Sequence, residues 1–273
     1  MKKLRIGIVG CGAIGSSLAK VIVKDFPGQA RLCGLYDLDK PKAVSLSKRL
    51  SGGSSLVMPG LKQLIAKSGL IIEAASAKVS WKIARFALAA GKDIMIMSVG
   101  GVSGRLKQLA ALAKNNNARA YMPSGAISGV DAVKAAAIGK IKKVILTTTK
   151  NPFSFKGVKY IKDKGINLAK IRKDTVLFSG KAAQAVKYFP QNINVAAVLG
   201  LAGVGANKTR VRIIASPKVS RNIHEIKVES SAGNIFTRTE NILHPDNPKT
   251  SYLAVLSAIA MLKQILEPVK IGT

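Results

Sequence analysis

Short apolar runs alternate with segments of helical periodicity over residues 1–122 of the chain. The runs predict buried strands, and the segments between them carry apolar residues at the three- and four-residue spacing of helices. The predicted strands are Leu4–Val9, Ala30–Tyr36, Leu56–Met58, Gly69–Ala75, Asp93–Met97 and Ala118–Met122, and the predicted helices are Ala13–Lys24, Pro41–Leu50, Lys78–Ala90 and Ser103–Asn115. Strands and helices that alternate in this way predict a parallel, doubly wound sheet.

The pattern changes after Pro123, where strands joined by short Gly, Pro or Ser turns become frequent. The predicted strands are Lys142–Lys150, Thr175–Phe178, Thr209–Ala215, Asn222–Ser230 and Asn234–Glu240, and the predicted helices are Gly180–Phe189 and Asn194–Val204. This region predicts an antiparallel or mixed sheet. A final helix is expected over Pro248–Leu266, with Asn247 as its N-cap and proline at its first position.

A glycine-rich turn follows the first predicted strand. Gly10, Gly12 and Gly15 have the G-x-G-x-x-G spacing of a dinucleotide-binding turn. In such a turn the first glycine permits the tight bend, the second lets the backbone approach a pyrophosphate, and the third allows close packing of helix on strand. The N–H groups of Ala13 and Ile14, at the start of the predicted helix, would then face the phosphates. A purely structural β-turn-α unit is the alternative.

A carboxylate follows the second apolar run, at the position where such folds bind an adenosine ribose. Asp37 lies 22 residues beyond Gly15. Its charge favours NAD because a carboxylate repels a 2′-phosphate, but Lys40 and the basic surroundings leave NADP open as an alternative. Ligands in doubly wound sheets bind at the carboxyl ends of strands, so Ala75 and Ser76 are also expected to contact the cofactor.

These patterns predict an α/β protein with three segments. Residues 1–122 form a Rossmann domain, a doubly wound parallel sheet that binds a dinucleotide. Residues 123–247 form a second α+β domain on a mixed or antiparallel sheet, which binds the substrate. Residues 248–273 form a C-terminal helix that is expected to pack back on the first domain.

The net charge of +31 in 273 residues raises the question of nucleic-acid binding. Basic residues are spread along the whole chain, and the densest stretch, Lys140–Lys173, has neither an aromatic stacking ladder nor a zinc-finger pattern. We therefore expect no specific nucleic-acid partner. The charge instead predicts a lysine-coated surface that keeps the protein soluble and steers small anions inward.

The remaining composition predicts a globular cytoplasmic protein with reduced thiols. Apolar residues make up 48% of the chain, and the cysteines, Cys11 and Cys33, both lie in the first two β-α units. The apolar stretch Tyr252–Leu262 is too short to span a bilayer, so no membrane partner is expected. No Cys or His pair has the spacing of metal ligands, and no metal is expected.

The sequence offers two histidines for proton transfer, His224 and His244. Alternation in the predicted strand Asn222–Ser230 puts His224 on the same face as apolar residues, Ile226 among them. It is therefore interpreted either as a hydrogen-bonded core residue or as a general acid/base. His244 is expected to be a solvated loop residue.

A cluster of polar residues is predicted at the start of the final helix. Lys249, Thr250 and Ser251 would lie at its N-terminus, which is a natural place to bind a substrate carboxylate. The alternative is that they are ordinary residues of a helix start.

Several further segments, in this order along the chain, resemble the L-aspartate dehydrogenase family. They are Glu73–Ser76, Ser98–Gly101, Pro123–Ile127, Phe189–Ala197, Asn222–His224 and Asn247–Ser251. The resemblance runs from the first strand to the last helix. The chain departs from the family pattern at Phe178–Ala182 and in the lysine-rich stretch near Lys156–Lys173, neither of which is a catalytic motif.

The resemblance implies a two-domain, often dimeric enzyme that acts on L-aspartate and oxaloacetate with NAD or NADP. It also implies that His224 is the catalytic residue, a general acid/base, and that Ala126 and Asn194 contact the cofactor. A homodimer with small-molecule substrates (L-aspartate, oxaloacetate and ammonia) is therefore expected. The alternatives are a homoserine dehydrogenase-like or dihydrodipicolinate reductase-like enzyme, or a non-catalytic nucleotide-sensing protein.

Overall fold

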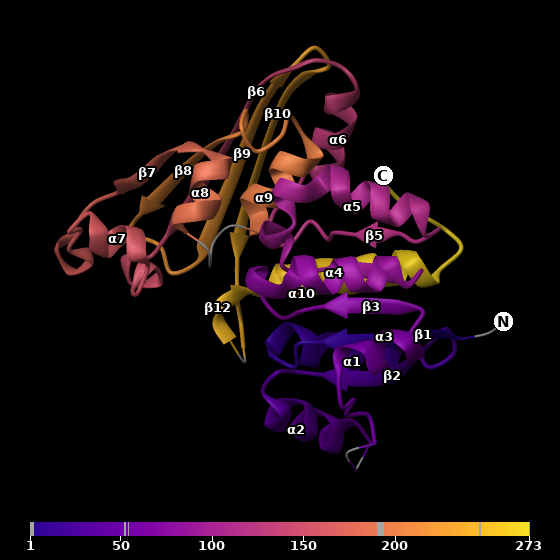
Figure 1. Ribbon diagram of the computed structural model, residues 1–273. Helices are drawn as coiled ribbons and strands as arrows, with labels where there is room; N and C mark the ends of the chain where they lie inside the picture. The colour runs from indigo at the N-terminus through magenta and orange to yellow at the C-terminus, as the bar shows by residue number, and fades with distance from the viewer. Residues whose placement is uncertain (1–2, 52, 54, 190–193, 246, 273) are drawn as a thin grey trace. The chain divides into compact units, whose positions relative to one another are not determined.

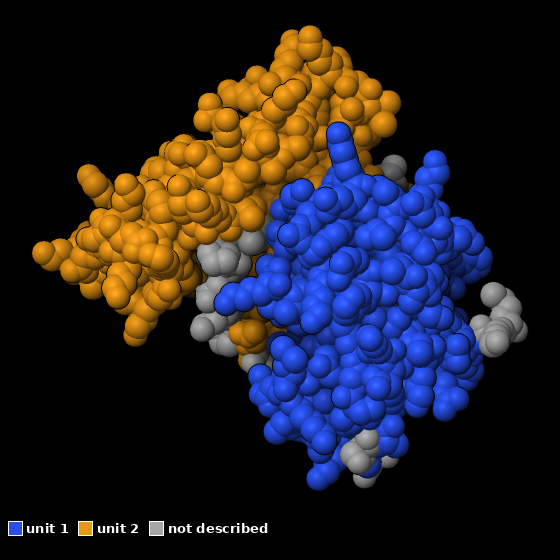
Figure 2. All heavy atoms as spheres, in the orientation of Figure 1, with its two compact units in different colours: residues 1–123, 257–271 blue, residues 124–256, 272–273 orange. Residues whose placement is uncertain are grey.

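The computed structural model describes residues 3–51, 53, 55–189, 194–245 and 247–272. The chain divides into two compact units, which Figure 2 shows in different colours. Unit 1 comprises residues 1–123 and 257–271, and unit 2 comprises residues 124–256 and 272–273. Among the described residues, none of the helices combines the length and the apolar character that a membrane crossing requires.

Unit 1 is built on a parallel sheet of five strands in the order β2-β1-β3-β4-β5 (Figure 1). The strands are β1 (Leu4–Val9), β2 (Ala30–Tyr36), β3 (Leu70–Glu73), β4 (Asp93–Ile96) and β5 (Ala120–Tyr121). The helices are α1 (Ala13–Asp25), α2 (Lys40–Ser51), α3 (Leu61–Lys67), α4 (Ala77–Ala89) and α5 (Leu106–Asn115), and short 3-10 turns cover Val99–Gly101 and Ser103–Arg105. Because strand order reverses between β1 and β3, ligands are expected at the carboxyl ends of these two strands.

The core of unit 1 joins the first strand to the last helix of the chain. Ile6 and Ile8 of β1 and Leu18 of α1 are fully buried, and Ala258 and Leu262 of α10 (Tyr252–Leu266) belong to the same cluster. The C-terminal helix therefore contributes to the hydrophobic core that supports the glycine turn.

Unit 2 is built on a second sheet in the order β10-β9-β6-β8-β7. Its strands are β6 (Ile141–Lys150), β7 (Thr175–Lys181), β8 (Arg210–Ala215), β9 (Asn222–Ser230) and β10 (Gly233–Asn241). Strands β6 and β8 are parallel and the other neighbours are antiparallel, so the predicted fold class is confirmed. The helices are α6 (Val130–Ile138), α7 (Lys159–Asp163), α8 (Ala182–Tyr188) and α9 (Asn194–Ala202), and 3-10 turns cover Pro152–Phe155 and Leu168–Lys170.

One face of the unit 2 sheet is apolar over most of its length and polar at one end. Buried apolar side chains alternate with half-buried or exposed side chains along much of β6 and β9, as the period of a strand requires. At the end of each strand the buried positions change to polar residues: Thr148 and Lys150 on β6, and His224 and Asn222 on β9. A polar group on an otherwise apolar face marks this end of the sheet as a candidate site.

The prediction of a helix beginning at Pro248 is wrong. Asn247–Ser251 is a strand, β12, which pairs with β11 (Leu243–His244), and helix α10 begins only at Tyr252. The φ angle that proline prefers suits the first turn of a helix and an edge strand alike, so the sequence signal was ambiguous. Lys249, Thr250 and Ser251 therefore do not form a helix N-terminus.

The other differences concern short elements. The expected strand Leu56–Met58 is an isolated bridge from Val57 to Leu35, and α3, α6 and α7 were not predicted. The expectation that His244 is solvated is wrong, because its side chain is buried and packs edge-on against Tyr252, with ring centroids 5.6 Å apart. His244 is the last residue of β11, which forms a hairpin with β12 that the sequence did not predict.

Candidate functional site

The glycine turn after β1 has the geometry that close approach to a phosphate requires. Gly10 has a φ of +95°, and a Cβ there would overlap the backbone of Ala74. A Cβ on Gly15 would overlap the carbonyl oxygen of Gly10. A Cβ on Gly12, in contrast, would meet nothing within 4 Å, so Gly12 borders open space. The first and third glycines thus serve the fold, and the second leaves room for a ligand.

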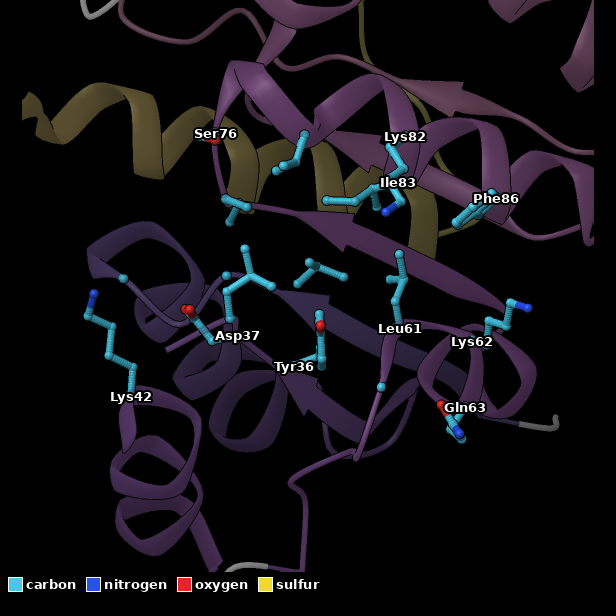
Figure 3. Close-up of a pocket in the computed structure, with 18 residues that line it drawn as sticks. Tyr36, Asp37, Lys42, Leu61, Lys62, Gln63, Ser76, Lys82, Ile83 and Phe86 are labelled. Carbon is cyan, nitrogen blue, oxygen red and sulfur yellow. The ribbon is translucent and has the colours of Figure 1, made fainter. Parts of the chain in front are cut away.

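A cavity of about 600 Å³ opens beside this turn in unit 1 (Figure 3). Of the residues predicted to bind the cofactor, the cavity is lined by Gly10, Gly12, Asp37, Ala75 and Ser76. Ala13, Ile14 and Gly15 form the first turn of α1 and are not among the lining residues.

The cavity also has walls that the sequence did not predict. Leu61 of α3 and Ile83 of α4 point toward one another across it, which gives an apolar slot suited to an adenine ring (Figure 3). Lys42, Lys62 and Lys82 add positive charge at the rim. The walls from α3 were missed because this helix of seven residues is too short to show a clear helical period.

Asp37 is fixed by the backbone and still has acceptor capacity. Its Oδ2 accepts the N–H of Cys11 at 2.7 Å, and its Oδ1 accepts the N–H of Asp39 at 2.9 Å. A carboxylate offers about four lone-pair sites, so two remain for ribose hydroxyls. Together with the open space at Gly12, this geometry fits the adenosine and pyrophosphate of a dinucleotide.

The cysteine in the turn, Cys11, is buried. Burial, and secondly the charge of Asp37, raise the pKa of the Cys11 thiol to about 12. A thiol of this kind stays protonated at neutral pH and is a poor nucleophile.

A buried carboxylate joins the loops that follow β3 and β4. Glu73 is fully buried, its Oε1 accepts the N–H of Ala75 at 2.9 Å, and its Oε2 accepts the N–H of Ser98 at 3.0 Å. Burial raises the pKa of Glu73, while these hydrogen bonds act in the opposite direction. Glu73 therefore positions the loop of Ala75, which lines the cavity.

Replacement of Glu73 by glutamine is expected to lower the free energy of unfolding by about 2–4 kcal/mol. The amide would place an N–H₂ group against one of the two backbone N–H donors and leave that donor unsatisfied. Urea unfolding measures the loss, with Glu229→Gln as a matched control. The carboxylate of Glu229 is exposed and makes only a surface ion pair with Lys143, so the control should change stability by less than about 1 kcal/mol. Equal stability of the two variants would contradict the role given to Glu73.

The polar end of the unit 2 sheet brings His224 together with two residues of β6. Thr148 lies directly opposite His224 in the strand register, and its Oγ1 is 3.0 Å from Nδ1 of the imidazole. Burial, and secondly the charge of Lys150, lower the pKa of His224 to about 3. Burial also lowers the pKa of Lys150, to about 8. His224 is thus a neutral imidazole at physiological pH, beside a buried ammonium group.

The low pKa of His224 predicts acid-dependent stability. The unfolded chain takes up a proton on this histidine below pH 6.5, whereas the folded chain does so only near pH 3. Stability should therefore fall as the pH drops through this window. Between pH 6.5 and 4.5 the wild type should lose about 2–3 kcal/mol relative to His224→Gln. Urea unfolding of both proteins at several pH values measures this difference, and a constant difference would refute the prediction.

A second group of polar side chains lies at the same end of the sheet. Asn222 Nδ2 is 3.4 Å from the hydroxyl oxygen of Ser251, and Asn241 Nδ2 donates to the carbonyl of Ala126 at 3.0 Å. Thr239 also donates to Ala126 O, at 3.2 Å. Two side chains of β10 therefore hold the backbone of Ala126, one of the predicted cofactor contacts.

The remaining residues of unit 2 that the sequence predicts to contact cofactor or substrate are Asn194, Lys249 and Thr250. Asn194 is the exposed first residue of α9, and residues 190–193 of the same motif lie outside the described residues. Thr250 pairs with the side chain of Asn247 at 3.1 Å. The side chain of Lys249 lies outside the described part of the structure. In the described ranges, no three His, Cys, Asp or Glu side chains gather as they would around a metal ion.

Two family profiles match successive parts of the chain. Residues 10–123 match the family described as homoserine dehydrogenase, NAD binding domain. Residues 131–265 match the family described as aspartate dehydrogenase, C-terminal. The border between the two matches falls near the change in sequence pattern after Pro123.

Curated relatives match over almost the full length. The L-aspartate dehydrogenase of Methanosarcina barkeri is 45% identical over 272 residues, which cover 99% of this chain and 100% of the relative. That of Methanococcus maripaludis is 41% identical over 273 residues, again 99% and 100%. Identity of this level over both units extends the similarity to the whole chain.

Solved structures agree on the fold. The aspartate dehydrogenase of Thermotoga maritima superposes with a TM-score of 0.75 at 26% identity and covers 99% of this chain and 100% of its own. A homoserine dehydrogenase from Thiobacillus denitrificans has a TM-score of 0.64 at 13% identity, covering 97% of this chain and 74% of its own. The latter likeness concerns the fold alone.

Proposed function

Because the chain belongs to the L-aspartate dehydrogenase family, we propose that it interconverts L-aspartate with oxaloacetate and ammonia through iminoaspartate, with His224 as general acid/base. The family makes the chain an NAD(P)-dependent amino-acid dehydrogenase. The observation that carries the residue assignment is the buried neutral imidazole at the polar end of the unit 2 sheet.

The proposed chemistry needs a group that accepts and donates protons at Cα, the carbon that bears the amine. A bound nicotinamide would supply hydride transfer at Cα of L-aspartate, in either direction. His224 takes a proton from the water that adds to the imine carbon. It then gives this proton to the amine and takes the proton of the new hydroxyl group as ammonia departs, which leaves the carbonyl of oxaloacetate.

Thr148 supports both stages of this proton transfer. A hydroxyl can accept a hydrogen bond from Nδ1 or donate one to it, so either tautomer of His224 is satisfied. The other ring nitrogen, Nε2, can therefore serve as acceptor or donor. A carboxylate in place of Thr148 would instead raise the pKa of the imidazole and favour its protonated form.

The cofactor is proposed to bind chiefly in unit 1. The backbone at Gly12, Ala13 and Ile14 would hold the pyrophosphate, Asp37 the adenosine ribose, and Ala75 and Ser76 the following part of the dinucleotide. From unit 2, Ala126 and Asn194 are proposed as further contacts. Lys249, Thr250 and Ser251 are proposed to contact the substrate. A homodimer is proposed from the family resemblance, and analytical ultracentrifugation tests it.

The activity is tested with purified protein, oxaloacetate, ammonia and NADH or NADPH, followed by absorbance. We expect NADH or NADPH to be oxidised faster with oxaloacetate than with other 2-oxo acids. Absence of oxidation with oxaloacetate would overturn the proposed reaction. Preference for another 2-oxo acid would favour a related dehydrogenase instead.

Asp37 is proposed to favour NADH over NADPH. Replacement of Asp37 by serine should shift the ratio of kcat/KM values toward NADPH by about tenfold, since the carboxylate repels a 2′-phosphate and accepts the ribose hydroxyls. Asp163→Asn is the control for the change in charge, because Asp163 is exposed, pairs with Lys159 at 2.8 Å and does not line the cavity. An unchanged ratio in Asp37→Ser, or an equal shift in both variants, would refute the ribose role.

A further inference from the structure

Lys150 differs from the other basic residues of this chain. The sequence contains 44 lysines and arginines, and among those whose side chains are described Lys150 alone is buried, with 8% of its surface exposed. The remaining ones give the protein its basic surface. Lys150 therefore contributes little to that surface and needs a separate explanation.

The position of Lys150 is fixed by two strands. It is the last residue of β6, it lies opposite Ala215 of β8, and its carbonyl accepts the N–H of Ser216 at 2.9 Å. Strand alternation puts it on the same face as Thr148, whose hydroxyl contacts His224. The charge of Lys150 also acts on the imidazole and opposes its protonation. The ammonium group thus belongs to the same polar end of the sheet as His224.

A buried ammonium group is costly to maintain. Removing it from water disfavours the charged form, which is why the pKa of Lys150 falls to about 8. Taking a charge out of water carries a large free-energy penalty, so a buried charge is weak evidence for a role in stability. Strongly shifted groups next to a proposed acid/base are typical of functional sites, where the charge meets a ligand of opposite sign.

We propose that Lys150 binds one of the two carboxylates of the substrate beside His224. This inference rests on the proposed function, in which both L-aspartate and oxaloacetate carry two carboxylates. A carboxylate next to Lys150 offsets the positive charge that opposes protonation of His224, so substrate binding makes the imidazole a better proton acceptor. Lys150 would thereby couple recognition of a dianion to the start of proton transfer.

The test replaces Lys150 by methionine and by glutamine, which both remove the charge and keep much of the side-chain length. We expect the KM for oxaloacetate to rise about 30-fold or more in both variants, with the Kd for NADH within about twofold of wild type. Lys142→Met is the matched control. Lys142 is an exposed residue of the same strand, so its loss lowers the net charge equally but should leave the KM unchanged.

A binding measurement separates this inference from the proposed reaction. Succinate is a dicarboxylate that cannot react, and calorimetry with the protein and NAD measures its affinity without turnover. We expect succinate to bind wild type and Lys142→Met alike, and to bind both Lys150 variants about 30-fold or more weakly. If wild type binds succinate through Lys150 but does not reduce oxaloacetate, the proposed reaction fails and the carboxylate site stands. A folded Lys150 variant with wild-type KM and succinate affinity would overturn the inference, as would failure of the wild type to bind succinate.

Discussion

Replacement of His224 by glutamine is expected to lower kcat for oxaloacetate reduction by about 10²–10⁴-fold, the usual contribution of a general acid/base. Glutamine keeps a polar side chain of similar length but cannot exchange a proton at neutral pH. His224 is buried beside Thr148, and glutamine has a volume similar to that of histidine. The fold should therefore be retained. Steady-state kinetics and the Kd for NADH, measured by fluorescence, separate loss of chemistry from loss of cofactor binding.

The chain provides its own control for this experiment. His244 is the other histidine, it is also buried, and it packs against Tyr252. His244→Gln should reduce kcat by less than about tenfold if general acid/base chemistry belongs to His224 alone. Turnover of His224→Gln at the wild-type rate, with cofactor bound, would rule out the proposed role of His224.

Replacement of Gly12 by valine is expected to weaken NADH binding by at least about tenfold while leaving the thermal midpoint of unfolding nearly unchanged. Gly12 has a φ of −74°, which any residue adopts, and an added Cβ meets no atom within 4 Å. The new side chain would instead occupy the open space where the backbone approaches a pyrophosphate.

Gly15 supplies the matched comparison for Gly12. A Cβ at Gly15 overlaps the carbonyl oxygen of Gly10, so even alanine should destabilise unit 1. Thermal unfolding should therefore separate the two variants, because Gly12→Val keeps the unfolding midpoint of the wild type and Gly15→Ala lowers it, whereas fluorescence titration reports the loss of NADH binding in Gly12→Val. Unimpaired NADH binding by Gly12→Val would contradict the pyrophosphate interpretation.

The cavity beside the glycine turn lies where the sequence placed a cofactor site, because the signal for this region is local. The glycine turn and Asp37 occupy one β-α-β segment, and their spacing reflects a geometry that recurs wherever a dinucleotide meets a strand end. Glu73 begins one of the family-like segments, but its role as a link between two loops requires knowing that β3 and β4 are neighbours.

The polar end of the unit 2 sheet depends on contacts between distant segments. Alternation along Lys142–Lys150 already placed Thr148 and Lys150 on one face, yet only the pairing of β6 with β9 identifies His224 as their neighbour. The hydrogen bond from Asn241 to Ala126 spans 115 positions of sequence. The periodicity within one segment cannot predict such a contact. The proline at position 248 is compatible with a helix start and with a strand, and the sequence pattern predicted a helix where the strand β12 occurs.

The core of unit 1 has a consequence for how the protein is synthesised. Ala258 and Leu262 are fully buried with residues of β1 and α1, so the first segments to leave the ribosome lack part of their core until the last ones follow. Domains generally fold as units during synthesis. The last strand of the unit 2 sheet ends at Asn241. Unit 2 can therefore form its sheet before helix α10, which completes the core of unit 1, has been synthesised.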